Sequence, residues 1–362
     1  YKIVLLVALL LNVTSCAITT TEPATDSVQK QQLLWPSPPD QPRFRYEGIL
    51  RSAADLQQQT EKSVFEKLKS ATTTENDASK DPVIFKPSGI AVRNGLVYVA
   101  EPAVRAITVF DIPRRKLFRF GLREPNTLKY PQAITLDAAG LVYVLDSGAR
   151  QVMVFDAYGL FASAIPLGNK FSRPVSIAVS PDGKAVYVVD RGTVEDNEHK
   201  VVALDAQGNE LFRLGPRGSR EGEFNIPLAA AVDKAGTLYV LDAGNFRVQA
   251  FDPTGKLRLV FGRMGSGLGS FSRPRAIATD AEGNIYVTDG AYNNVQIFNP
   301  HGELLMPLGR LSQQPGPGRY SLIAGVAVDE ANRLLVLDHY FRKIEIYSRV
   351  PEEEGKRLMN ES

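Results

Sequence analysis

The sequence predicts an all-β protein: a six-bladed β-propeller of four-stranded antiparallel blades, with the ring closed by an N-terminal strand. Three observations lead to this prediction. One strand-rich segment recurs six times at intervals of 43 to 53 residues, each copy continues into further apolar runs, and a spare strand precedes the first copy. A repeat of about 45 residues with four strands is typical of a propeller blade.

The first strand of each copy begins at a proline, except in the sixth copy, where Ile323 takes its place. These segments are short, apolar and rich in Ile, Ala and Val, which favours buried strands. They read KPSGIAV (86–92), YPQAITL (130–136), RPVSIAV (173–179), IPLAAAV (226–232), RPRAIAT (273–279) and LIAGVAV (322–328).

The second strand of each copy ends in an acidic residue, and a third strand begins six residues later in five of the copies. In the third copy, an insertion over residues 192–200 lengthens this gap. A second turn then leads to a fourth strand such as ELFRLG. Alternating strands joined by tight turns predict an antiparallel meander. The six acids are Glu101, Asp146, Asp190, Asp242, Asp289 and Asp338.

The sixth copy ends after its third strand, so its blade lacks a fourth. We expect residues 43–50 to supply this strand by pairing with residues 343–347, which would close the ring and leave no open edge. The propeller then spans residues 83–349. A polar connection with a short helix near residues 63–69 occupies 51–82, and a charged tail occupies 350–362.

The amino terminus has the layout of a signal peptide over residues 1–15: Lys2, nine apolar residues (3–11) and small residues before Cys16. Nine residues are too few to span a bilayer as a helix. Residues 13–16 (VTSC) resemble a bacterial lipobox, which implies lipidation of Cys16 and anchoring to a membrane of the cell envelope. Ala17 after the cysteine favours the outer membrane by the same resemblance. The alternative is an ordinary secretory signal with a coincidental cysteine.

Residues 16–42 are rich in Pro, Thr and Gln and predict a disordered tether that holds the domain away from the membrane. Charge is balanced, with 42 basic and 40 acidic residues, so nothing demands a nucleic acid as partner. The single cysteine and three scattered histidines give no metal-binding or haem-attachment motif. We therefore expect no cofactor and no metal site.

Two loops before the repeat proline, 215–227 and 262–274, are glycine-rich and carry a phenylalanine near their end. In these loops, and in the recurrence of the whole pattern over residues 83–349, the sequence resembles NHL-repeat propellers. The resemblance implies a protein-interaction scaffold. NHL-like lipoproteins of this build resemble those encoded beside multihaem c-type cytochromes, which implies an envelope partner of that kind and an accessory role in extracellular electron transfer.

The resemblance also reaches enzymes and nucleic-acid binders. NHL-like amidating lyases place several histidines around a metal, and lactonase-type propellers place acids around calcium in the channel. The scattered histidines do not fit the first arrangement, and the mostly apolar inner strands do not fit the second. Some NHL domains bind single-stranded RNA, but export across the membrane argues against that partner.

The candidate contact residues lie on the loops between the second and third strands and between blades, because these loops are longer than the turns at the other end of each strand. We expect a partner or ligand to contact Arg275, Arg273, Arg191, Glu195 and His199. The six acids are a repeated feature, so we interpret them as loop caps rather than as a metal or catalytic site, with Asp146–Arg150 and Asp242–Arg247 as expected ion pairs.

The favoured function is therefore a membrane-tethered scaffold that binds another envelope protein through its longer loops. The alternative is a small-molecule hydrolase or lyase with its site at the central channel, where Arg275 could hold an anion. The absence of a nucleophile triad or a phosphate loop favours the scaffold, but the sequence leaves the question of enzymatic activity open.

Overall fold

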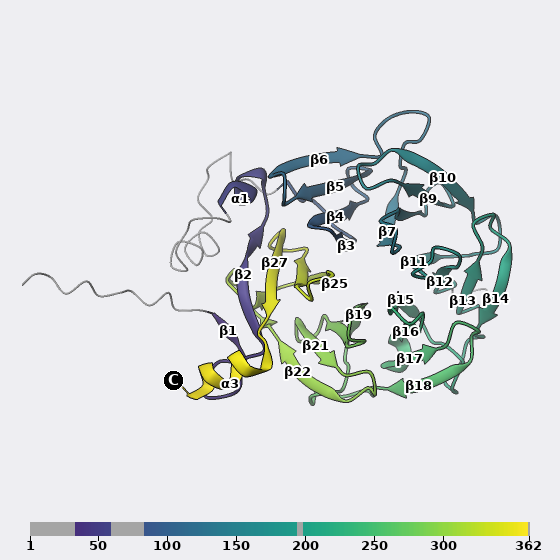
Figure 1. Cartoon of the computed structure of the whole chain (residues 1–362). Helices are drawn as coiled ribbons and strands as arrows, with labels where there is room; N and C mark the ends of the chain where they lie inside the picture. The colour runs from purple at the N-terminus through teal and green to yellow at the C-terminus, as the bar shows by residue number, and fades with distance from the viewer. Residues whose placement is uncertain (1–32, 59–82, 194–197, 361–362) are drawn as a thin grey trace, which may run out of the picture.

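Each repeat folds into one antiparallel sheet, and six sheets stand around a central axis as the blades of a β-propeller (Figure 1). This computed structural model describes residues 33–58, 83–193 and 198–360. The predicted fold is confirmed, including the number of blades and the four-stranded meander. Only about 6% of the described residues are helical.

The four strands of a blade lie side by side, in order from the centre of the ring to its rim. The innermost strands are β3 (Gly89–Arg93), β7 (Pro131–Leu136), β11 (Pro174–Val179), β15 (Pro227–Val232), β19 (Pro274–Thr279) and β25 (Ile323–Val328). The second strands are β4 (Leu96–Glu101), β8 (Val142–Asp146), β12 (Val186–Asp190), β16 (Leu238–Asp242), β20 (Ile285–Asp289) and β26 (Leu334–Asp338).

The third and fourth strands complete the blades toward the rim. The third strands are β5 (Ala106–Asp111), β9 (Gln151–Phe155), β13 (Lys200–Leu204), β17 (Arg247–Phe251), β21 (Asn294–Phe298) and β27 (Lys343–Arg349). The fourth strands are β6 (Lys116–Phe120), β10 (Phe161–Pro166), β14 (Glu210–Leu214), β18 (Leu257–Phe261), β22 (Leu304–Leu308) and β2 (Phe44–Leu50). A short helix, η2 (Ala243–Asn245), and a parallel pair, β23 (Arg310–Leu311) with β24 (Arg319–Tyr320), lie in the loops.

The hydrophobic core lies between the blades. Both faces of the second strand are buried in every blade, as in Val142–Asp146, because neighbouring blades cover them. Each cluster of buried side chains draws on two adjacent blades; one, for example, joins Tyr98 of the first blade to Val144 of the second. This packing requires a closed ring, since an open ring would expose two blade faces to water.

The ring closes as predicted, because β2 pairs antiparallel with β27 and Tyr46 lies opposite Tyr347. Of the tether expected over residues 16–42, only residues 33–42 are among those described, and these do not fit a disordered segment. Leu34 and Trp35 form a fifth strand, β1 (Leu34–Trp35), on the outer edge of β2. Trp35 packs edge-on against Tyr347 at 5.3 Å between ring centroids, which explains why a Pro-rich segment is ordered here.

Two helices flank the closing strand. Helix α1 (Ala53–Gln58) begins where the carboxylate of Asp55 accepts hydrogen bonds from the amides of Arg51 and Ser52. The helix expected near residues 63–69 lies outside the described residues. The expected charged tail forms helix α3 (Glu352–Asn360), which packs beside the N-terminal segment at the rim (Figure 1). In the described part of the chain, no helix is both long and apolar enough to cross a membrane.

Candidate functional site

The loops of the propeller are sorted onto two faces by strand direction. The innermost and second strands of each blade run antiparallel, so the start of β11 at Pro174 lies beside the end of β12 at Asp190. The loops between blades therefore share one end of the ring with the loops between second and third strands. We call this end the long-loop face and the opposite end, which carries the tight turns, the turn face.

The six acids that end the second strands lie under the long-loop face, and their side chains are fully buried. Each accepts hydrogen bonds from backbone amides of the loop that enters its own blade. Asp146, for example, accepts from Lys129, Tyr130 and Ala149 at 2.6 to 2.9 Å. No group of three or more His, Cys, Asp or Glu side chains arranged to hold a metal occurs among the described residues.

One of the two ion pairs expected for these acids is present. The Nε of Arg247 lies 2.8 Å from the carboxylate of Asp242, and burial nevertheless raises the pKa of Asp242. The prediction for Asp146 and Arg150 is wrong. Arg150 donates instead to the carbonyls of Gly168 and Phe171 in the next loop, because its side chain crosses to the neighbouring blade.

Replacing one of these acids should destabilise the ring without changing its exposed surface. Asp338 accepts from the amides of Ser321, Leu322 and Phe341 at 2.7 to 3.1 Å. We expect Asp338→Ala to lower the free energy of unfolding by about 3 kcal/mol, because the buried donors lose their acceptor. Urea denaturation measures this loss. Asp338→Asn keeps one acceptor oxygen and should lose less; equal stability of the Ala variant and the parent would contradict the capping role.

The long-loop face carries most of the large apolar side chains that are exposed in the described residues. Met264, Leu268 and Tyr340 are about two-thirds exposed, at 66%, 67% and 65%. Most other large apolar side chains that remain exposed in the described residues lie on the same face: Phe85, Leu122, Tyr130, Ile226, Leu311 and Leu322. Exposed apolar groups gathered on one face of a monomer mark an interaction surface.

The same face also carries an excess of cations. Its exposed arginines include Arg105, Arg123, Arg173, Arg263, Arg273, Arg275, Arg310 and Arg342. Within residues 33–58, 83–193 and 198–360, none of these guanidinium groups forms an ion pair. Among the described residues of these loops, the exposed carboxylates are fewer: Glu124, Glu198 and Glu221. Although the charge of the whole chain is nearly balanced, the long-loop face is therefore basic.

The central channel opens on this face. It has a volume of about 320 Å³ and is lined mainly by Ala, Ile and Val of the six innermost strands. Arg275 lines the channel and stays exposed at the start of β19. A Cβ added at Gly290 would lie 3.3 Å from the Cγ and Nε of Arg275, so the absence of a side chain at Gly290 makes room for this arginine.

The other predicted contact residues differ in their exposure. Arg273 is exposed next to Arg275, and Arg191 is partly buried, where burial and then the charge of Arg173 lower its pKa. His199 differs from the expectation of a surface contact: it is buried, and its Nδ1 accepts the amide of Ile226, so it positions the next loop. Glu195 and Cys16 lie outside the described residues.

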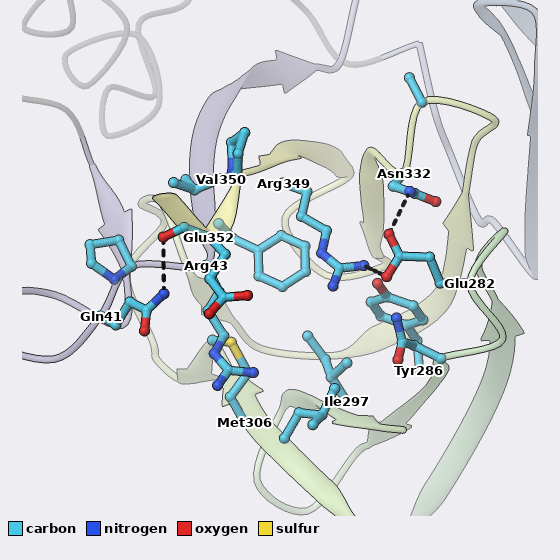
Figure 2. Close-up of a pocket in the computed structure, with 16 residues that line it drawn as sticks. Gln41, Arg43, Glu282, Tyr286, Ile297, Met306, Asn332, Arg349, Val350 and Glu352 are labelled. Carbon is cyan, nitrogen blue, oxygen red and sulfur yellow. Dashed lines mark hydrogen bonds and ion pairs between the residues drawn. The ribbon is translucent and has the colours of Figure 1, made fainter. Parts of the chain in front are cut away.

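A second cavity, which the sequence did not predict, lies on the turn face between the fifth and sixth blades (Figure 2). Its volume is about 550 Å³. Residues from both ends of the chain contribute to it, including Arg43 and Arg349, together with the apolar side chains of Ile297 and Met306. Figure 2 shows Arg349 directed at Glu282 across one wall of this cavity.

Comparison with known proteins agrees with an NHL-type propeller. The family model of the NHL repeat matches residues 224–251, within the fourth blade. Rat peptidylglycine alpha-amidating monooxygenase is 27% identical over 138 residues, which cover 34% of this chain but only 14% of that protein. The chain is thus similar to a small part of that relative.

Solved structures share the fold at low sequence identity. A protein of unknown function from Bacteroides thetaiotaomicron matches with a TM-score of 0.59 and 14% identity, covering 85% of this chain and 76% of that one. A gluconolactonase from Xanthomonas campestris matches at 0.55 and 19%, covering 74% and 86%. A streptogramin B lyase matches at 0.53 and 13%, covering 77% and 96%. These likenesses establish the propeller fold alone.

Proposed function

We propose that this chain is a lipid-anchored scaffold of the bacterial cell envelope that binds an acidic partner protein through its long-loop face. The single observation that carries the proposal is the coincidence of exposed apolar side chains and unpaired arginines on that face. Apolar contacts give affinity at the centre of an interface, and opposite charge speeds and orients the encounter. NHL-repeat propellers are typical protein-interaction scaffolds, which is consistent with this use.

The location and the partner are part of the proposal. Cys16 would carry the lipid, and the segment that follows would connect the membrane to β1 at the rim of the ring. We place the protein at the outer membrane, with an envelope protein as its partner. A multihaem c-type cytochrome is the partner that the sequence resemblance favours, which would make the protein an accessory of extracellular electron transfer.

The test is affinity capture of the full chain from its native cells after mild crosslinking, with quantitative mass spectrometry. We expect a stoichiometric envelope protein with an acidic surface. Its recovery should fall at least tenfold for a triple variant, Arg173→Glu, Arg273→Glu and Arg275→Glu, because three attractive charges become repulsive. The matched control reverses three exposed lysines of the turn face, Lys184, Lys234 and Lys256, and should leave recovery unchanged.

Recovery of the chain alone, or equal recovery for both triple variants, would contradict the scaffold. The second candidate function, a hydrolase or lyase, is favoured by one observation, the exposed Arg275 that lines the channel. Arg275→Ala alone separates the two functions. A scaffold should retain its partner because the rest of the face is intact, whereas an enzyme should lose turnover of a lactone such as gluconolactone while remaining folded.

A further inference from the structure

We propose that the cavity between the fifth and sixth blades binds a small organic anion that carries an apolar body. This site lies on the turn face and is separate from the proposed interaction surface. The inference rests on the way the ring closes, on the side chains that line the cavity and on one cation that makes no ion pair there.

The cavity exists because the sixth blade lacks a turn that fills the same place elsewhere. In four of the other five seams, the glycine turn between the third and fourth strands of one blade packs on the fourth strand of the blade before it. A Cβ at Gly159 would lie 2.3 Å from Phe120, one at Gly255 would lie 3.0 Å from Phe212, and one at Gly302 would lie 2.8 Å from Phe261. Each of these turns thus lies directly against the preceding blade, with no room for a Cβ at its glycine.

In the sixth blade, β27 ends near the carboxyl terminus and β2 begins near the amino terminus, so no turn joins them. The fourth strand of the fifth blade, β22, is therefore not covered in this way. The cavity of about 550 Å³ that results lies within the range of sites that bind small ligands. Its apolar lining comes from Phe44, Ile297, Leu305 and Met306.

The charges around the cavity are paired, with one exception. Arg349 lies 2.8 Å from the carboxylate of Glu282 and 3.4 Å from that of Asp280. Glu352 pairs with Lys356 at 2.9 Å, and this pairing lowers the pKa of Glu352, with a smaller contribution from Arg43. The guanidinium of Arg43 itself is exposed and makes no ion pair or side-chain hydrogen bond within the described residues.

The ligand class follows from this arrangement. A carboxylate or sulfonate would pair with Arg43, and a rigid apolar group would cover the side chains of Ile297, Leu305 and Met306. A cation would meet no carboxylate without a partner in the lining, because Glu282 already pairs with Arg349 and Glu352 with Lys356. The site is thus distinct from the central channel, whose lining includes Arg275.

Calorimetric titration of the full chain with 2-naphthoate, and with its neutral isostere 2-naphthamide, tests the proposal. We expect one saturable site that prefers the carboxylate. Arg43→Gln should weaken 2-naphthoate binding about tenfold, the value of one charge-assisted hydrogen bond, and should leave 2-naphthamide binding unchanged. Leu305→Trp should abolish binding of both compounds by filling the cavity, whereas Arg123→Gln, an exposed arginine of the opposite face, should change neither.

Three results would overturn the proposal. The first is an absence of saturable binding by the parent chain. The second is equal affinity for the acid and the amide, which would make the cavity a general apolar site. The third is unchanged 2-naphthoate affinity in both Arg43→Gln and Leu305→Trp. Thermal melting of the two variants, which should match the parent within a few degrees, shows that lost binding does not reflect unfolding.

Discussion

Deletion of residues 43–50 is expected to lower the melting temperature by more than about 15 °C or to prevent folding. This segment is β2, which pairs with β27 along its length and buries Phe44, Ile49 and Leu50. Burial of three such side chains contributes about 5–9 kcal/mol, a large share of the stability of a single domain. The deletion also opens the ring and exposes the core between the sixth and first blades. Circular dichroism during heating measures the effect.

A variant of the same strand distinguishes the effect of losing the closing strand from the effect of losing its polar side-chain contacts. Arg45 and Glu47 lie on the same strand but are only partly buried, and they form polar contacts with Glu354 and Ser348. The double substitution Arg45→Ala and Glu47→Ala keeps the strand and should cost about 1 kcal/mol or less. If the deletion melted at the temperature of this variant, the closing strand would not stabilise the ring.

The sequence predicted the fold well because each repeat is self-similar and each element follows a short-range rule. The prolines, the terminal acids and the glycine turns recur in register, so the strand order of a blade could be read from one copy and checked in five others. Even the closing strand could be found, since the sixth copy lacked its fourth strand and residues 43–50 had the missing pattern. That residues 34–35 form the ordered strand β1 could not be predicted, because this strand depends on the contact of Trp35 with Tyr347.

The candidate sites were less predictable because they depend on departures from the repeat. Arg275 was found as an unusual residue after the proline, but the space that Gly290 leaves for it appears only when both lie in one fold. Arg173 could have been predicted as a contact residue. It precedes the repeat proline of the third copy, just as the predicted contact residue Arg273 precedes that of the fifth. The cavity at the seam results from residues more than 200 positions apart, and no local pattern indicates it.

The substitution Glu345→Gln is expected to lower the free energy of unfolding by about 3 kcal/mol, and the melting temperature by about 6–10 °C. Glu345 and Lys343 are both buried and form an ion pair on β27. Lys343 also donates to the carbonyls of Gly316 and Arg319, and Glu345 accepts from the amide of Gly318, so the pair holds the loop between the last two blades. The substitution would leave the ammonium of Lys343 buried without its counter-charge.

The fifth blade supplies the control, because its third strand is bridged to the preceding loop by an uncharged side chain. At the positions of Lys343 and Glu345 it has Asn294 and Gln296. Gln296 alone makes the bridge, since it accepts from the amide of Gly269 and donates to the carbonyl of Ser270, whereas the buried Oδ1 of Asn294 has no hydrogen-bond partner among the described residues. The double variant Lys343→Asn and Glu345→Gln copies this pair and should recover most of the stability lost in Glu345→Gln. A double variant less stable than the single one would mean that the charge itself, and not the polar bridge to the loop, stabilises the last blade.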